Sequence, residues 1–206
     1  MGAFYTSILL KGIERDHIIS WLKENKREAA VYPENSGCIP VFDAAFESQE
    51  MSEINGFCED VTRGLGCIAW AVTNHDDDLL HYRLYNQGQM TDEYFSVPPE
   101  VLFGIDDPDE FDEDQPVELS FTPKGGDATL LCDVFGNPGN PREVESILRD
   151  LGGMGGQFIM ATDRHYALLE ALSITPDGLC SGYREVVQGY LPPNISSSDL
   201  DIIDTA

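Results

Sequence analysis

The sequence contains few basic residues. It has 12 Lys and Arg against 37 Asp and Glu, which gives a formal net charge of -25. Nucleic acid backbones are polyanions, and proteins bind them with basic residues that displace counterions. The composition therefore excludes nucleic acids and anionic membrane surfaces as partners, whereas cations and basic proteins would be attracted. The alternative is that the charge serves solubility alone.

The sequence also lacks long apolar runs and cysteine motifs. No stretch approaches the roughly 20 apolar residues that a membrane-spanning helix needs, and no basic residue precedes the short apolar run near the start. The number of cysteines is odd and no C-x-x-C occurs, so neither a disulfide framework nor a zinc site is predicted. We expect a cytoplasmic protein with reduced thiols at Cys38, Cys58, Cys67, Cys132 and Cys180.

Complete catalytic and cofactor motifs are missing as well. The segment "GLCSG" (178–182) imitates a nucleophile elbow centred on Cys180, but no histidine follows it in the chain. The segment "LGGMGGQ" (151–157) fits neither the dinucleotide-binding nor the P-loop pattern. We therefore predict no cofactor and assign no catalytic residue. A thiol pair of Cys180 or Cys132 with His165 stays open, because sequence alone cannot exclude their proximity.

The pattern of apolar residues predicts an α+β fold. The first part reads as β-α-β-β-α-β, an order typical of a ferredoxin-like antiparallel sheet with two helices on one face. The expected strands span residues 4–12, 28–34, 37–46 and 67–73, and the expected helices span residues 14–27 and 49–65. A β-hairpin within residues 79–97 extends this sheet.

The second part of the chain reads differently. Seven acids between Asp106 and Asp114 predict a solvated linker or loop. Helices are expected at Asp127–Phe135, Pro141–Asp150 and Thr162–Leu172, the last with Thr162 as N-cap, followed by a strand within residues 179–189. We accordingly divide the chain into an α+β sheet domain (1–104), an acidic linker (105–124), a smaller helical part with a final strand (125–192) and a polar tail (193–206).

The hairpin register follows from an expected three-residue loop, Asn86-Gln87-Gly88, with Gly88 left-handed. The loop places one mostly apolar face on the core and a polar face opposite it. The expected pairs are Leu84–Met90, Tyr82–Asp92 and Leu80–Tyr94 on the apolar face, and Arg83–Thr91, His81–Glu93 and Leu79–Phe95 on the polar face. Asp92 would thus lie among apolar neighbours and need a hydrogen-bonding partner.

Three consecutive aspartates precede this hairpin. The simpler interpretation of Asp76, Asp77 and Asp78 is a solvated turn between two strands. The alternative is a site for Ca²⁺ or Mg²⁺ built from their carboxylates, with His75 or His81 nearby. No EF-hand loop pattern supports that alternative. The candidate binding residues are His75, Asp76, Asp77, Asp78, His81, Asp92 and Glu93, with Asp76 and Asp78 as the speculative metal ligands.

Four segments carry a resemblance to a protein family. They are "NHDDDLLHYRLYNQGQMTDEYFSVP", "GGDATLLCDVFG", "TDRHYALLEAL" and "SGYREV". With these segments the chain resembles a family of uncharacterised bacterial proteins of similar size, over most of residues 4–190. The resemblance implies a bacterial, cytoplasmic source and no mechanism. The acidic insert at Asp106–Asp114 and the tail after Pro193 depart from the family pattern.

Three functional hypotheses follow from the sequence. The first is a non-enzymatic interaction protein, for example an adaptor or immunity-like protein that neutralises a basic partner. The second is a divalent-cation-binding protein or metal-dependent hydrolase that uses the Asp76–Asp78 loop. The third is a cysteine hydrolase that uses Cys180 or Cys132 with His165.

Overall fold

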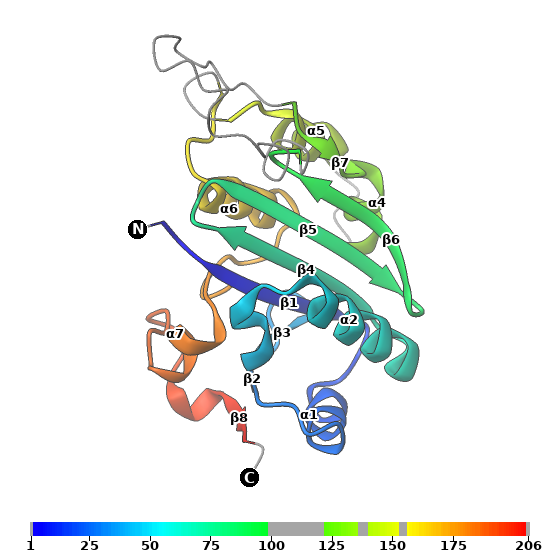
Figure 1. The fold of residues 1–206 in the computed structure, drawn as a ribbon, viewed down its shortest axis with the longest axis vertical. Helices are drawn as coiled ribbons and strands as arrows, with labels where there is room; N and C mark the ends of the chain where they lie inside the picture. Colours follow the sequence, from blue (N-terminus) through cyan, green and yellow to red (C-terminus); the bar gives the residue numbers. More distant parts are fainter. Residues whose placement is uncertain (1, 99–121, 136–139, 153–155, 205–206) are drawn as a thin grey trace, which may run out of the picture.

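The computed structural model describes residues 2–98, 122–135, 140–152 and 156–204 (Figure 1). The described residues form six α-helices and one eight-stranded antiparallel sheet, which confirms the predicted α+β class. The acidic segment Asp106–Asp114, predicted to be a linker, lies outside the described residues.

The sheet runs through the whole molecule in the order β7-β6-β5-β4-β1-β3-β2-β8. Its strands are β1 (Tyr5–Lys11), β2 (Ala29–Val31), β3 (Cys38–Asp43), β4 (Ile68–His75), β5 (Leu79–Asn86), β6 (Gln89–Phe95), β7 (Lys124–Gly125) and β8 (Asp201–Ile203). β1 and β4 are central strands, buried along nearly their whole length, because helices cover both of their faces.

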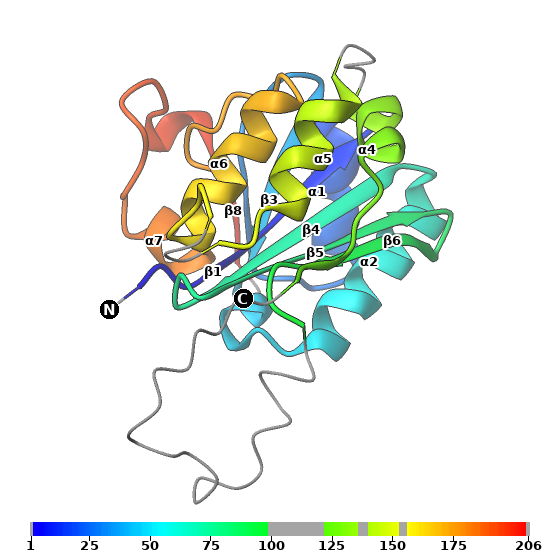
Figure 2. The same ribbon diagram turned by 90° about the horizontal axis from the view of Figure 1, so that it is seen from above.

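Helices lie on both faces of the sheet, and Figure 2 shows α4, α5 and α6 on the side opposite to α2. α1 (Arg15–Glu24) and α2 (Met51–Leu65) cover one face, where Ile18, Phe57 and Val61 pack against Ile8 and Leu10 of β1. The other face carries α4 (Ala128–Phe135), α5 (Pro141–Arg149), α6 (Ala161–Ala171) and α7 (Tyr183–Val187). Two 3₁₀ turns, η1 (Ala44–Ser48) and η4 (Ser197–Asp199), complete the described elements.

The hairpin β5–β6 forms as predicted, but its register was predicted wrongly. The turn has two central residues, Gln87 and Gly88, both with positive φ (51° and 74°), which is the geometry of a type I′ turn. A bulge then shifts the pairing, so that Leu84 faces Asp92 and Arg83 faces Glu93. The main ladder is displaced by two residues from the predicted one. An even displacement keeps each side chain on its face, because side chains alternate with a period of two.

Met90 is the exception to this conservation of faces. It pairs with Tyr85 before the bulge and is 49% exposed, whereas we predicted it beside Leu84 on the apolar face. Leu80, Tyr82, Leu84 and Tyr94 all lie in the core, as predicted, and α4, α5 and α6 cover them there. The bulge therefore changes the environment of the residues next to the turn and leaves the core side of the hairpin unchanged.

Three predictions for the second part of the chain need correction or completion. The strand predicted within residues 179–189 is the helix α7, with Gly182 as its N-cap and the Glu185 carboxylate accepting from the Gly182 N–H. Thr162 is not the N-cap of α6, because Met160 occupies that position. The tail, which the sequence left without an assignment, contributes the edge strand β8, paired with β2.

In the described part of the chain, no helix combines the length and the apolar character that crossing a bilayer requires.

Candidate functional site

The three aspartates form the turn between β4 and β5, where His75 pairs with Leu79. Asp76 and Asp77 have left-handed φ values of 53° and 63°, which Asp tolerates better than most residues. The Asp76 carboxylate accepts a hydrogen bond from the Gly2 N–H at 2.9 Å, and Asp78 is exposed.

The carboxylate, the carbonyl and the N–H of Asp77 are all hydrogen-bonded within the protein. The interpretation of this turn as merely solvated is therefore wrong for this residue. Its carboxylate accepts from the Ala3 N–H at 2.7 Å, from Asn74 Nδ2 at 3.1 Å and from both the N–H and the hydroxyl of Thr162. Its carbonyl accepts the Ala161 N–H at 2.8 Å, and its own N–H donates to Ala3 and Asn74. Asp77 therefore joins the start of β1, the end of β4 and the first turn of α6.

The protonation of Asp77 reflects these contacts. Burial acts to raise the pKa of this carboxyl, but the hydrogen bonds from Thr162, Ala3 and Asn74 outweigh it and lower the pKa below its ordinary value. The ionised form is therefore the one that the fold stabilises. This stabilisation is present above the unfolded-state pKa and is lost as the pH falls through the lowered folded-state value.

A second polar group lies directly beneath this turn. His165 of α6 is 1% exposed, and its Nδ1 lies 2.8 Å from the Tyr5 hydroxyl and 3.3 Å from Cys180 Sγ. The Tyr5 and His165 rings stack with centroids 5.8 Å apart. Together with the turn these residues make one connected group, the Asp77 cluster, which consists of Tyr5, Asn74, Asp77, Thr162, His165 and Cys180.

The structure therefore selects Cys180 over Cys132 as the neighbour of His165, a pairing that sequence reasoning left open. Burial lowers the pKa of His165 to about 3 and raises the pKa of the partly exposed Cys180 to about 12. Both shifts favour a neutral thiol beside a neutral imidazole. A thiolate nucleophile needs a nearby positive charge or another feature that lowers the pKa of the thiol. Here the pKa of Cys180 is raised, and the neighbouring imidazole is neutral.

The other candidate residues lie on the hairpin, on two different faces of the sheet. Asp92 accepts from the Tyr82 hydroxyl at 2.8 Å and from the Asp127 N–H at 2.9 Å, which ties the hairpin to the start of α4. On the opposite face one oxygen of Glu93 contacts both His81 Nε2 at 3.2 Å and Arg83 Nε at 2.6 Å. These carboxylates are hydrogen-bonded within the protein, and they do not converge with the Asp76–Asp78 turn.

His81 is neutral in this arrangement. Burial and the neighbouring Arg83 lower its pKa to about 4, although Glu93 acts in the opposite direction. The other candidate histidine, His75, contacts Gln49 through its Nδ1 at 2.8 Å. Across the residues that the structure describes, no group of three His, Cys, Asp or Glu side chains is placed to hold a metal ion.

The distribution of charge is the other marked feature of the surface. Seven of the eight arginines form ion pairs with carboxylates within the described residues. Two of these pairs are well buried on the arginine side, those of Arg83 with Glu93 and of Arg164 with Asp150. Most of the described acids, in contrast, are exposed. Most arginines are thus ion-paired, at the surface as well as inside the fold, and the excess carboxylates face solvent.

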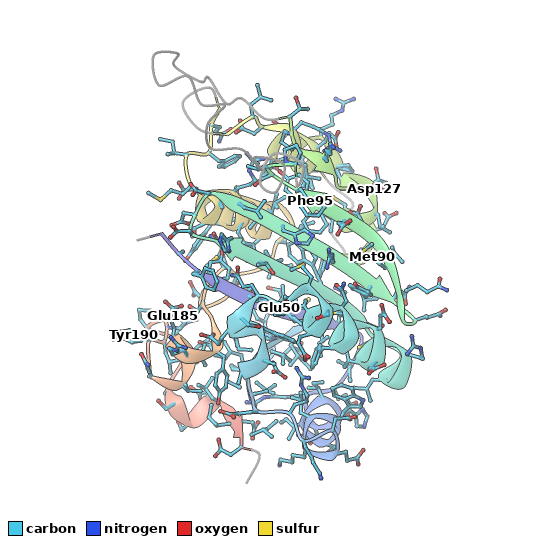
Figure 3. The ribbon with its side chains drawn as sticks, in the orientation of Figure 1. Glu50, Met90, Phe95, Asp127, Glu185 and Tyr190 are labelled. Carbon is cyan, nitrogen blue, oxygen red and sulfur yellow. The ribbon has the colours of Figure 1, made fainter. Side chains whose placement is uncertain are left out.

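Exposed apolar side chains collect near the Asp77 cluster. Ile159 is 76% exposed and Met160 51% exposed at the start of α6, while Tyr190 is 71% exposed just beyond α7. Figure 1 shows α6, α7 and the start of β1 on the same side of the molecule, and Figure 3 shows Glu185 and Tyr190 close together there. We define the α6–α7 surface as Ile159, Met160, Asp163, Tyr166, Glu170, Glu185, Val187 and Tyr190.

Comparison with known proteins gives no relative for this chain. No family model, no curated protein and no solved structure matches it. The resemblance to a bacterial family therefore stays a prediction, and the functional argument depends on the geometry.

Proposed function

We propose that this protein is a non-enzymatic interaction protein that binds a basic protein through its carboxylate surface. The observation that carries the proposal is the imbalance between paired and unpaired charge. Most arginine side chains are ion-paired, three of them with little exposed side-chain area, whereas the acids are mostly exposed. A field of one sign attracts a partner of the opposite sign and accelerates its association.

The α6–α7 surface is the best place for this contact. Asp163, Tyr166 and Glu170 follow one another at helical spacing of three and four residues, so they share one exposed stripe of α6. Interfaces combine aromatic anchors with charged residues around them, and the α6–α7 surface offers both, with Tyr166 and Tyr190 beside its acids.

The experiment is affinity capture with the tagged protein, followed by binding of the purified candidate partner. We expect one basic protein that binds saturably at about 0.15 M salt and dissociates as salt screens the charges over a Debye length of about 8 Å. The variant D78N/D163N/E170Q removes two exposed acids of the α6–α7 surface and Asp78 of the β4–β5 turn, which contacts the start of α6. It should weaken binding at least about tenfold, because each lost charge pair contributes on the order of 0.5–1 kcal/mol.

The matched control is D16N/E24Q/D60N, which removes three exposed acids from α1 and α2. It changes the net charge equally and should weaken binding much less. Equal losses of affinity in both variants would mean that only total charge matters, and the assignment of the contact to the α6–α7 surface would be wrong. A partner whose affinity does not depend on salt, or a partner that is acidic, would contradict the proposal itself.

A second candidate function has one specific observation in its favour. Cys180 Sγ lies 3.3 Å from His165 Nδ1, which is the contact that a cysteine hydrolase would need. The raised pKa of Cys180 and the lowered pKa of His165 oppose it. We therefore predict that Cys180 reacts with iodoacetamide at pH 7.5 at least about 100-fold more slowly than free cysteine, because little thiolate is present. Rapid, selective labelling of Cys180, abolished in H165Q, would restore the hydrolase hypothesis.

The proposal includes a finer account of the fold and the location. The order β4-β1-β3-β2, all antiparallel, and the placement of α1 and α2 on one face support a ferredoxin-like unit for residues 5–75. All five cysteines are free, and four of them are buried, which supports a reducing, cytoplasmic environment.

A further inference from the structure

His165 lies where three parts of the fold meet. It belongs to α6, and its Nδ1 lies 2.8 Å from the Tyr5 hydroxyl of β1 and 3.3 Å from Cys180 Sγ of the segment before α7. Gly182, the N-cap of α7, also packs on Tyr5, since a Cβ at this glycine would come within 3.6 Å of the Tyr5 Cβ. One buried imidazole therefore joins α6 and the start of α7 to the sheet.

Cys180 is the neighbour of His165 that reaches solvent. The ring also contacts Tyr5 and Trp70, which are 2% and 0% exposed, whereas Cys180 is partly exposed. Residues 176–182 form hydrogen bonds among themselves and with α7, and within the described structure only Cys180 bonds this segment to α6 or β1. Leu179 is fully buried, so the smallest movement that would hydrate the imidazole is one of residues 180–182.

The groups around His165 offer no partner for a positive charge on its ring. The imidazole meets a phenol from β1, a thiol from the segment before α7 and an indole from β4. Burial alone lowers its pKa, to about 3, with no contribution from a charged side chain of the described residues. The nearest carboxylate of the cluster, that of Asp77, already accepts hydrogen bonds from Ala3, Asn74 and Thr162.

The remaining elements that pack on α6 leave this environment unchanged. Arg164, the preceding residue, bonds the Tyr94 hydroxyl of β6 and the carbonyls of Ile147 and Asp150 at the end of α5. From β5, Tyr82 enters the same core with its hydroxyl bonded to Asp92. The titratable and charged groups that face α6 from its neighbours are Tyr5, Asp77, Tyr82, Tyr94, Asp150 and Cys180.

Protonation of His165 would set donors against one another. The Nδ1 of a neutral imidazole can accept from the Tyr5 hydroxyl or from the Cys180 thiol, whereas an imidazolium donates from both nitrogens and accepts nothing. A buried charge without a partner is costly, and access of water removes that cost. The movement of residues 180–182 would supply the water.

We propose that acid releases residues 180–182 from His165 and thereby takes apart the α6–α7 surface. The two elements that carry this surface meet at the imidazole, with Tyr166 on α6 and Glu185 on α7. The inference deepens the proposed function, and it rests on that function for its consequence, which is that the basic partner dissociates at acid pH.

The expected size of the effect follows from linkage. The folded-state pKa of His165 is about 3 against an ordinary value of 6.5, so the closed form loses ground once the pH falls below about 6.5. Each further pH unit favours the released form by about tenfold until the pH approaches 3. Between pH 7 and pH 5 the equilibrium constant for release should therefore rise about 25-fold.

The test measures this release on the full chain without the partner. 4,4′-Dithiodipyridine reacts when the Cys180 thiolate attacks its disulfide and displaces 4-thiopyridone, so a mixed disulfide marks an accessible Cys180. The rate at each pH is divided by the rate of N-acetylcysteine at the same pH, which removes the ordinary titration of a thiol. We expect this ratio to rise about 25-fold from pH 7 to pH 5. Cys132, which is 1% exposed, is the internal control and should react at least about 100-fold more slowly than Cys180 at pH 5.

Two variants show whether His165 is the titrating group. H165Q removes it, and the Cys180 ratio should then change less than about twofold between pH 7 and pH 5. H17Q removes the exposed histidine of α1 and should keep the full rise. If H165Q does not fold, the comparison of Cys180 with Cys132 in the native protein still decides, because release confined to residues 180–182 labels Cys180 alone.

Three outcomes would overturn the inference. They are a Cys180 ratio that does not change with pH in the native protein, equal labelling of Cys132 and Cys180 at pH 5, and a full rise in H165Q. Failure of the proposed function is distinguishable, because it would appear as the absence of a salt-sensitive basic partner, and the labelling needs no partner. A basic partner whose affinity has the same pH dependence for the native protein and H165Q would preserve the proposed function and overturn the acid release of the surface.

Discussion

The Asp77 cluster and a cavity lined by Tyr32, Glu34, Asn35, Thr175 and Asp177, here called the Tyr32 cavity, lie on the same face of the sheet. In the Asp77 cluster each carboxylate oxygen, amide and hydroxyl meets a partner from the protein, drawn from four separate segments. In the Tyr32 cavity the phenol hydroxyl has none, and two carboxylates stay exposed. Buried polar groups that meet partners stabilise the fold, whereas a buried polar group without a partner lowers its stability.

Tyrosine makes this comparison direct, because each site contains one that is almost fully buried. The Tyr5 hydroxyl contacts His165 at 2.8 Å, and the Tyr32 hydroxyl has no partner among the described residues. Burial raises the pKa of both phenols, that of Tyr32 to about 12, so both are neutral at physiological pH. The two residues differ in hydrogen bonding and not in burial or ionisation.

The largest expected effect comes from removing the centre of the satisfied cluster. D77A deletes the acceptor for Ala3, Asn74 and Thr162 and leaves their donors without it. We expect a loss of about 3 kcal/mol in the free energy of unfolding, because one helix-end contact and several charged hydrogen bonds disappear together. Urea unfolding followed by circular dichroism measures this loss.

D78A is the matched control, since Asp78 is the exposed neighbour in the same turn. Its stability should stay within about 0.5 kcal/mol of the native protein. Equal effects of D77A and D78A would show that the turn as a whole, and not the Asp77 contacts, is what matters. A cation-dependent rise in stability that D77A abolishes would instead support the metal hypothesis.

The second effect concerns the buried imidazole of the same cluster. Burial lowers the pKa of His165 to about 3, so the unfolded state takes up a proton near pH 6.5 that the folded state does not. Stability is fully present above that pH and is lost as the pH falls. Relative to H165Q, the native protein should lose about 1.4 kcal/mol per pH unit below pH 6, hence about 1–2 kcal/mol by pH 5. Parallel stability curves for the two proteins would contradict a neutral buried His165.

Parts of this picture could be predicted from the sequence, and the hairpin shows why. Alternation of apolar and polar residues places Leu80, Tyr82 and Leu84 on the core side in any register that is shifted from the predicted one by an even number of residues. The register itself depends on Gln87 adopting a left-handed conformation and on the bulge after the turn, which alternation does not encode. The same limit explains α7, since "YREVV" contains β-branched residues and forms a helix through its cap and its packing on Tyr32 and Phe42.

The sites were less predictable than the elements. Three consecutive aspartates marked the turn as a candidate site. The role of Asp77, however, depends on Ala3 and Thr162, which lie 74 and 85 residues away in the sequence. No local pattern signals such a contact. The pairing of Cys180 with His165 could be posed as a hypothesis because both residue types are reactive, whereas a buried tyrosine without a partner has no signature in the sequence at all.

A smaller effect separates the two tyrosines. Y5F removes a hydroxyl that is bonded to His165 and leaves the imidazole without that partner. We expect a loss of about 1–2 kcal/mol in the free energy of unfolding, the usual cost of breaking one buried hydrogen bond. Thermal and urea unfolding measure it. A neutral outcome would mean that Cys180, at 3.3 Å from the same nitrogen, replaces the phenol as partner, and the double variant Y5F/C180A would then show the missing loss.

The smallest effect is the one that distinguishes the sites most clearly. Y32F makes the same chemical change at a position of equal burial, but it removes a hydroxyl that has no described partner. The stability should therefore stay within about 0.5 kcal/mol of the native value or rise, because no hydrogen bond is lost and a buried polar group is removed. A loss as large as that of Y5F would mean that the Tyr32 hydroxyl is bonded in solution, by water or by the protein.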